Sequence, residues 1–408
     1  MEEVNMSDAL LELIQASDEE KKRKGTEYTP AEIYQQPEMW RQTLEILESQ
    51  KAEIAKFLGG ETDRKFLLTG AGTSAFIGLC LENLFNKNSG YEARAVGTTE
   101  IITDPDAVFL AGRKYFLVHF ARSGNSPESV GTFVVGEQSR ADVKHIVITC
   151  NKDGKLAVMG REQQDRSLII LLPEKTNDQS LAMTSSFSSM VVAGQYLASL
   201  KDTVNFAGIV DRMAKAGEVI MSEYSGALAE VCQADFGRAV FLGSNTLFGC
   251  AKECHLKLQE ETDGKVVGKF DTFLGLRHGP EAVVRDETLV VYLMSEDPLV
   301  HRYELDLING VKKKGIGLTK VALCGQADQA TKAAADLVIE HGCDIPDDYQ
   351  SPAYVILGQT LGVFKSMYYG LKPDSPSAAG VITRVVQGVQ IYDHPAFRAD
   401  GTLNVIAG

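Results

Sequence analysis

A glycine-rich turn near residue 70 could hold an anion. The segment Gly70–Ser74 (GAGTS) follows a short apolar run and precedes a predicted helix. Gly72, Thr73 and Ser74 would offer backbone N–H groups, two hydroxyls and the positive end of the helix dipole. A dinucleotide site is the less favoured interpretation, because Ser74 and Ala75 stand where the third glycine of that fingerprint would be.

A second turn, ARSGNSPES at residues 121–129, is more specific. Gly124 permits close approach of the backbone to a ligand, and Ser123 and Ser126 supply hydroxyl donors on either side of Asn125. Arg122 adds the cation that a phosphate monoester requires. Together these residues predict a phosphate site.

A third hydroxyl-rich segment, TSSFSS, begins with Thr184 and Ser185 at a predicted helix start. One such cluster is more often a capped helix or a polar loop. Three clusters in one half of the chain favour an anion site.

Candidate acid and base groups lie in the second half. Phe248–Thr262 is predicted to be a helix on which Lys257 and Glu260, three residues apart, share a face. His278 precedes a Gly-Pro turn and could act as an acid near neutral pH. Without further information, Glu260 would more often be a surface partner of Lys257, and His278 a structural turn residue.

Short apolar runs that end in polar turns recur along the chain and predict buried parallel strands joined by helices. Ligands bind beyond the carboxyl ends of such strands, and this position favours the turns after the strands as binding sites. The order repeats in the second half, but Ser295-Glu296-Asp297 replaces the SGNS turn there, so only the first half is predicted to hold an anion. Strands are predicted at residues 65–69, 115–120, 145–150, 167–172, 238–242, 288–294, 320–324 and 335–340.

The composition excludes several classes of protein. A chain of 408 residues with net charge −14 has room for two or three domains and lacks the basic character of nucleic-acid or anionic-membrane binders. The seven cysteines form no CxxC pair, so neither a zinc site nor a disulfide framework is predicted. No apolar run is long enough to span a membrane, and we expect a cytoplasmic protein.

The ordered motifs resemble those of tandem sugar-isomerase (SIS) domain proteins. The resemblance covers most of residues 30 to 395 and includes GAGTS, SGNS, TSSFSS, LKLQEE at 256–261 and LRHGPEAVV at 276–284. It implies an α/β fold with two doubly wound parallel-sheet SIS domains. The expected organisation is a helical extension (1–48), a phosphosugar-binding domain (49–205), a catalytic domain (206–380) and a tail (381–408).

The resemblance also implies roles for individual residues. Glu260 matches the enolisation base that moves a proton between C1 and C2, and Lys257 matches a lysine that holds this base. His278 matches a residue that assists ring opening and is often supplied by the partner subunit. The resemblance implies a homodimer or larger oligomer with shared active sites. It implies neither a metal nor an organic cofactor. The implied phosphosugar-binding residues are Gly72, Thr73, Ser74, Arg122, Ser123, Gly124, Asn125, Ser126, Thr184 and Ser185.

Two departures from the synthase members narrow the expected reaction. The chain has no N-terminal cysteine nucleophile, and Gln387 lies near the position of the synthase tail lysine. Length, turn and tail most resemble galactosamine-6-phosphate deaminase/isomerases, also called tagatose-6-phosphate ketose/aldose isomerases. We therefore expect conversion of D-galactosamine 6-phosphate to D-tagatose 6-phosphate and ammonia. The alternatives are a glucosamine-6-phosphate deaminase, a ketose/aldose isomerase and a noncatalytic sugar-phosphate sensor.

Overall fold

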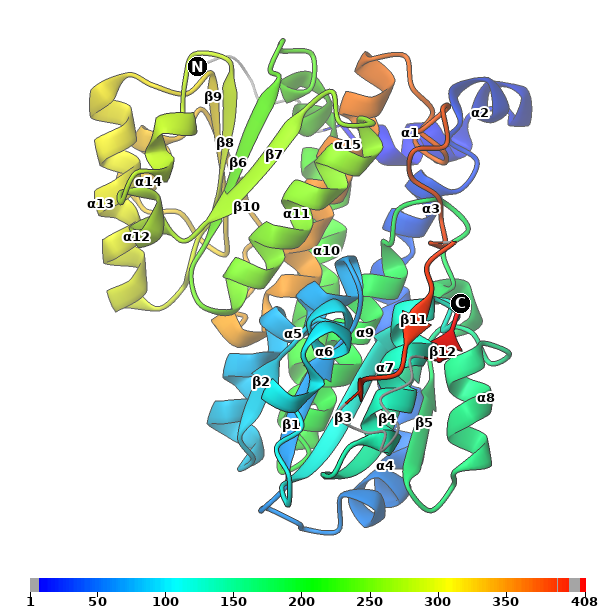
Figure 1. The fold of residues 1–408 in the computed structure, drawn as a ribbon. Coiled ribbons are helices and arrows are strands. Elements are labelled where there is room, and N and C mark those ends of the chain that lie inside the picture. Colours follow the sequence, from blue (N-terminus) through cyan, green and yellow to red (C-terminus); the bar gives the residue numbers. More distant parts are fainter. Residues whose placement is uncertain (1–6, 387, 396–403) are drawn as a thin grey trace. The chain divides into compact units, whose positions relative to one another are not determined.

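The computed structural model describes residues 7–386, 388–395 and 404–408 (Figure 1). The chain divides into two compact units, each with its own five-stranded parallel sheet. The two units alternate along the chain. The domain boundaries predicted from the sequence, at residues 48, 205 and 380, stay a proposal. The first-sheet unit comprises Gln42–Asn177, Ser189–Phe206 and Thr383–Gly408; the second-sheet unit comprises Met1–Arg41, Asp178–Ser188 and Ala207–Ile382.

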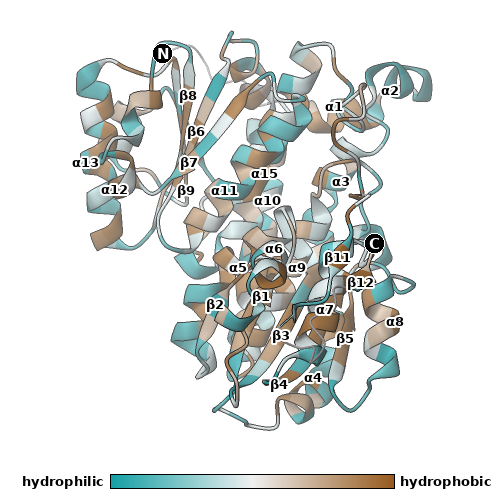
Figure 2. Cartoon of the chain, viewed as in Figure 1, coloured by the Kyte–Doolittle hydropathy of each residue, from teal (hydrophilic) through white to brown (hydrophobic). Residues whose placement is uncertain are grey.

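The first sheet has the strand order β2-β1-β3-β4-β5, and all its neighbouring strands are parallel. The four predicted strands of this half are confirmed, whereas the edge strand β2 was not predicted. Figure 2 shows β3, β4 and β5 as mostly hydrophobic, which agrees with their burial. The strands are β1 (Lys65–Thr69), β2 (Ala93–Ala95), β3 (Lys114–Ala121), β4 (Asp142–Thr149) and β5 (Ser167–Leu171).

Helices connect these strands and pack on the sheet. Helix α5 contacts β1 and β2, and helix α8 contacts β4 and β5. Helix α7 starts with Pro127 directly after Ser126, whose side chain accepts the N–H of Ser129 as an N-cap. The helices are α5 (Thr73–Leu84), α6 (Thr98–Thr103), α7 (Pro127–Gln138), α8 (Lys155–Glu162) and α9 (Ser185–Ala198).

The second sheet repeats this topology in the order β10-β9-β8-β6-β7. Its central strands are buried on both faces, as the apolar runs predicted. The strands are β6 (Arg238–Gly243), β7 (Val267–Asp271), β8 (Thr288–Leu293), β9 (Thr319–Cys324) and β10 (Leu337–Glu340). The associated helices are α10 (Thr203–Val231), α11 (Thr246–Glu261), α12 (Phe273–Leu276), α13 (Pro298–Lys314), α14 (Gln329–Ala334) and α15 (Ser351–Tyr368).

The chain ends add smaller elements. Helix α3 starts at Thr29 with Pro30 in its first turn. Near the C-terminus, strands β11 (Ile391–Tyr392) and β12 (Val405–Ala407) pair antiparallel and contact α7. Across the described residues, no helix is long and apolar enough to cross a membrane. The N-terminal helices are α1 (Ala9–Gln15), α2 (Asp18–Lys24), α3 (Thr29–Tyr34) and α4 (Gln36–Leu58).

Candidate active site

The turn after β1 has the backbone geometry of an anion-binding turn. Gly72 has φ 57°, a left-handed conformation that favours glycine, and α5 begins at the next residue. Gly70 also has no room for a side chain, because a Cβ atom there would lie 2.5 Å from the backbone of Ser74. Thr73 and Ser74 are buried in the first turn of α5, beside its N-terminal N–H groups.

The turn after β3 is fixed by the loop that follows β4. The Leu156 N–H donates to the Gly124 carbonyl over 3.0 Å, and the Lys155 N–H donates to Asn125 Oδ1 over 2.9 Å. Asn151 Nδ2 donates to the Ser123 carbonyl over 3.0 Å. Residues 122–126 are therefore held in one conformation before any ligand binds, which lowers the entropic cost of binding.

Arg122 contacts the C-terminal tail. Its Nη2 atom donates to the carbonyl oxygen of Arg384 over 2.7 Å, and only 6% of the residue is exposed. The Arg384 guanidinium in turn donates to Asn177 Oδ1 over 3.0 Å. Arg122, the cation predicted to bind the phosphate, thus also holds a segment 262 positions further along the chain.

A cavity of about 320 Å³ opens at the carboxyl ends of β4 and β5. Its lining includes Asn151, which bonds to the Ser123 carbonyl, and Asn177, which bonds to Arg384. The cavity therefore adjoins the predicted phosphate turn, where a doubly wound sheet binds its ligands. Its remaining lining residues are Cys150, Lys152, Asp153, Leu171, Leu172 and Glu174.

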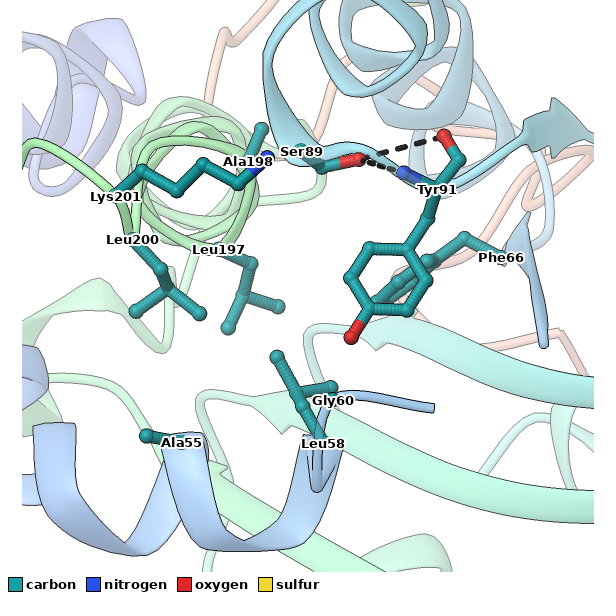
Figure 3. A pocket seen from close by; sticks show the side chains of 10 residues that line it. All are labelled: Ala55, Leu58, Gly60, Phe66, Ser89, Tyr91, Leu197, Ala198, Leu200 and Lys201. Atoms are coloured by element: carbon teal, nitrogen blue, oxygen red, sulfur yellow. Dashed lines mark hydrogen bonds between the residues drawn. The ribbon is translucent and has the colours of Figure 1, made fainter. Parts of the chain in front are cut away.

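A smaller cavity of about 200 Å³ lies away from this edge (Figure 3). Phe66, near the start of β1, lines it together with Tyr91, Leu197 and Lys201. Ser89 Oγ accepts the Tyr91 N–H over 3.0 Å at its wall. The lining is mostly apolar and contains none of the predicted site residues.

The chain's own carboxylates bind the corresponding turns of the second sheet. The Ser295 N–H, after β8, donates to Glu304 Oε2 over 2.8 Å, and Ser244 Oγ, after β6, donates to Glu304 Oε1 over 2.7 Å. Asp347 accepts the next N–H, from Glu296, over 2.8 Å. That only the first half holds an anion stays a prediction, and the pairing of the Ser295 and Glu296 N–H groups agrees with it.

Glu304 gives a first testable prediction. Burial raises the pKa of Glu304 to about 8 against hydrogen bonds from Ser295 and Ser244, with Asp347 adding to the increase. Between about pH 4.5 and pH 8 the folded protein keeps a proton that the unfolded chain has lost, so stability falls as the pH rises. Glu304→Gln should remove up to about 5 kcal/mol of this loss, since each unit of pKa difference corresponds to about 1.4 kcal/mol. Melting temperatures measured from pH 5 to 8 should fall less for the variant than for the wild type; parallel curves would contradict the assignment.

The hydroxyl-rich start of α9 belongs to the second-sheet unit and is organised by Asp178. This buried carboxylate accepts the N–H groups of Thr184 and Ser186 over 2.8 and 2.9 Å, and the hydroxyl of Ser185 over 2.5 Å. Ser185 Oγ also accepts from Gln35 Nε2 over 2.9 Å. Thr184 Oγ1 is buried without a hydrogen-bond partner among the described residues, so Thr184 is better suited than Ser185 to meet a substrate hydroxyl.

The predicted pair on α11 is a buried ion-pair triad. Lys257 Nζ lies 2.6 Å from Glu260 Oε2 and 3.2 Å from Glu253 Oε1. Lys257 and Glu253 are almost fully buried, whereas a quarter of the Glu260 side chain is exposed. Burial alone would lower the pKa of Lys257, but the two carboxylates outweigh it and raise that pKa. Lys257 therefore stays charged and fixes Glu260, the member of the triad that solvent reaches.

Two histidines of the second-sheet unit, His278 and His255, differ in exposure. His278 is exposed in the turn between α12 and Pro280, and its N–H donates to the Gly275 carbonyl over 3.0 Å. His255 is packed against Phe270, and burial lowers its pKa to about 4, so it is neutral at physiological pH. Of the two, His278 is the one accessible to a substrate or a neighbouring subunit.

Sequence reasoning did not identify Asp178, Asn177, Arg384 or Glu253. Glu253 could have been found, because it lies four residues before Lys257 on the same helix face. Arg384 acts through contacts between distant segments, which no local pattern reveals, whereas Asp178 binds groups six to eight residues further along the chain. Gln387, considered as a replacement for the tail lysine, lies outside the described residues.

Comparison with proteins of known sequence identifies relatives over most of the chain, although no family model matches. A protein of Streptomyces coelicolor, provisionally named D-galactosamine-6-phosphate deaminase AgaS, is 36% identical over 372 residues, which are 90% of this chain and 95% of that protein. D-galactosamine-6-phosphate deaminase AgaS of Escherichia coli is 33% identical over 371 residues, again 90% and 95% of the two chains.

Solved structures agree with these sequence matches. A Clostridium novyi protein, provisionally named tagatose-6-phosphate ketose/aldose isomerase, superposes with a TM-score of 0.89 at 33% identity and covers 94% of this chain and 99% of its own. Tagatose-6-phosphate ketose/aldose isomerase of Escherichia coli gives 0.79 at 31% identity, covering 88% and 97%. The C-terminal domain of glucosamine-fructose-6-phosphate aminotransferase of Francisella tularensis shares the fold, with a TM-score of 0.72 at 18% identity, covering 88% and 100%.

Proposed function

The chain belongs to the AgaS family of SIS-fold phosphosugar deaminases and isomerases, and from this premise we propose that it converts D-galactosamine 6-phosphate to D-tagatose 6-phosphate and ammonia. The observation that carries the proposal is the triad on α11. It presents one solvent-accessible carboxylate, Glu260, on a buried ammonium, Lys257. A base held in a fixed position is what proton abstraction from a carbon acid requires.

In this proposal Glu260 removes the proton from C2 of the open-chain sugar and returns it at C1, which leaves an imine at C2. Water then adds to C2 and the C2–N bond breaks, which gives the ketone and releases ammonia. Lys257 remains an ammonium throughout, because its two carboxylate partners favour the charged form, and it orients the base. His278 assists ring opening, a role consistent with its exposure, in its own subunit or in that of a neighbour within a homo-oligomer.

The phosphate group is assigned to the turns after β1 and β3. Gly72–Ser74 provides helix N-terminal N–H groups, and Arg122–Ser126 provides hydroxyls and a guanidinium on a fixed backbone. This local site allows an acidic chain to bind an anion. The proposal includes no metal or organic cofactor, and we expect the protein to act in the cytoplasm.

The test of this function is a substrate panel with the full chain. Galactosamine 6-phosphate, glucosamine 6-phosphate and tagatose 6-phosphate are each incubated with the protein, and ammonia and the sugar products are quantified. We expect ammonia from galactosamine 6-phosphate at the highest rate. A higher rate with glucosamine 6-phosphate would identify a glucosamine-6-phosphate deaminase. Interconversion of ketose and aldose phosphates without ammonia would identify an isomerase, and binding without turnover would identify a sensor. Each of these results would contradict the proposed reaction.

A further inference from the structure

The C-terminal tail contacts the phosphate turn and the helix that follows it. At the start of the turn, Arg122 donates to the Arg384 carbonyl over 2.7 Å. After it, Ile391 packs on α7 so closely that a Cβ atom on Gly131 would lie 2.7 Å from Ile391 Cγ2. Ile391 is 4% exposed, and both short tail strands contact α7. These contacts hold the tail at the segment that carries Ser123 and Ser126.

Arg384 contacts a residue that lines the cavity beside this turn. Its guanidinium bonds to Asn177, which lines the 320 Å³ cavity, and Asn151, which also lines it, bonds to the Ser123 carbonyl. Arg122, the neighbour of Ser123 in the sequence, donates to the Arg384 carbonyl. The tail is therefore joined to the candidate site by hydrogen bonds at Arg122 and at Asn177.

The charge of the site supports a binding role for Arg384. A phosphate monoester carries nearly two negative charges at neutral pH, and the chain as a whole has net charge −14. The phosphate turn itself contains one cation, Arg122, which also holds the tail. A guanidinium presents five N–H groups in a planar fork, which suits it to hold Asn177 and a phosphate oxygen together.

We propose that Arg384 is a substrate-binding residue that the C-terminal tail delivers to the phosphate site. The inference rests on the proposed assignment of the phosphate to the turn after β3. Arg122 is then a positioning residue for the tail as well as a phosphate ligand. Arg384 would distinguish sugar phosphates from free sugars, because its charge is matched to the phosphate group.

Calorimetric titration of the full chain with inorganic phosphate tests this inference without requiring turnover. Arg384→Gln should weaken phosphate binding about 10- to 100-fold, the effect expected from losing a charge-assisted hydrogen bond. The KM for galactosamine 6-phosphate should rise by a similar factor while kcat stays within about threefold. Arg140→Gln is the matched control, because it removes an exposed guanidinium that lies just before β4, at the opposite end of that strand from the cavity; its affinity for phosphate should change less than threefold.

Gly131→Val gives a second test that keeps the guanidinium. The larger side chain would displace Ile391 and loosen the tail, so phosphate affinity should fall although Arg384 is present. Arg384→Lys keeps the charge but not the planar fork. Its phosphate affinity should lie between those of the wild type and Arg384→Gln. Phosphate affinity of Arg384→Gln within twofold of wild type, an equal loss of affinity in Arg140→Gln, or no phosphate binding by the wild type would overturn the inference. Turnover of galactosamine 6-phosphate by an Arg384→Gln enzyme with unchanged KM would overturn it and leave the proposed function intact.

Discussion

Replacing Glu260 by Gln should reduce kcat by about 10²- to 10⁴-fold, the contribution that a positioned general base makes to proton transfer. The amide has the shape of the carboxylate and can still accept a hydrogen bond from Lys257, so the helix and the binding turns should be undisturbed. Binding of inorganic phosphate should therefore remain within about twofold of wild type. The measurement is steady-state release of ammonia or ketose phosphate, together with calorimetric phosphate binding.

The chain provides a matched control at the next residue. Glu261 is also on α11, is 1% exposed, and has no hydrogen-bond partner for either carboxyl oxygen among the described residues. Burial raises the pKa of Glu261 well above its usual range and so favours the neutral form of the side chain. Glu261→Gln keeps the shape of this buried side chain and should leave kcat nearly unchanged. Equal losses in the two variants would show that Glu260 acts through the fold and not as the base.

Replacing Lys257 by Met should have the largest effect on stability. The substitution leaves the carboxylates of Glu253 and Glu260 without their cation, and Glu253 is fully buried. Removing one partner of a buried ion pair costs about 3 to 5 kcal/mol, because the remaining charge is uncompensated. Urea unfolding at pH 7 should show this decrease in the free energy of unfolding, and catalytic activity should fall as well.

A double variant separates the charge effect from the loss of packing. In Lys257→Met/Glu253→Gln, the buried Glu253 carboxylate becomes a neutral amide, so part of the lost free energy of unfolding should return. We expect the double variant to be more stable than Lys257→Met alone by about 1 to 3 kcal/mol. A double variant as unstable as the single one, or less stable, would show that Lys257 contributes packing and not charge compensation.

The strands that carry the turns could be predicted because they are buried on both faces. The runs that became β1, β3 and β8 are continuous apolar segments ending in glycine or polar residues, and β1 occupies exactly the predicted residues Lys65–Thr69. The edge strands β2 and β7 have weaker patterns, because β2 has three residues and β7 exposes Val267 and Lys269. Only the repeat of strand order between the two halves could have indicated them.

The site was predictable where function depends on local chemistry. The glycines of the turns and the three-residue spacing of Lys257 and Glu260 are visible in the sequence, and the structure confirms the turn at Gly72 and the ion pair. The burial that makes Lys257 a fixed ammonium could not be predicted, because it depends on packing between helices α11 and α15. Arg384 likewise acts through contacts with Arg122 and Asn177, more than 200 positions earlier in the chain, which only the folded structure brings together.

Proton NMR of galactosamine 6-phosphate during incubation with the full chain tests the central claim most directly. The signal of the hydrogen on C2 should disappear with the wild type as ammonia is released, and should persist with Glu260→Gln at equal protein concentration. A C2 hydrogen signal that persists with the wild type, or that disappears as fast with Glu260→Gln, would contradict the assignment of Glu260 as the base that moves this proton.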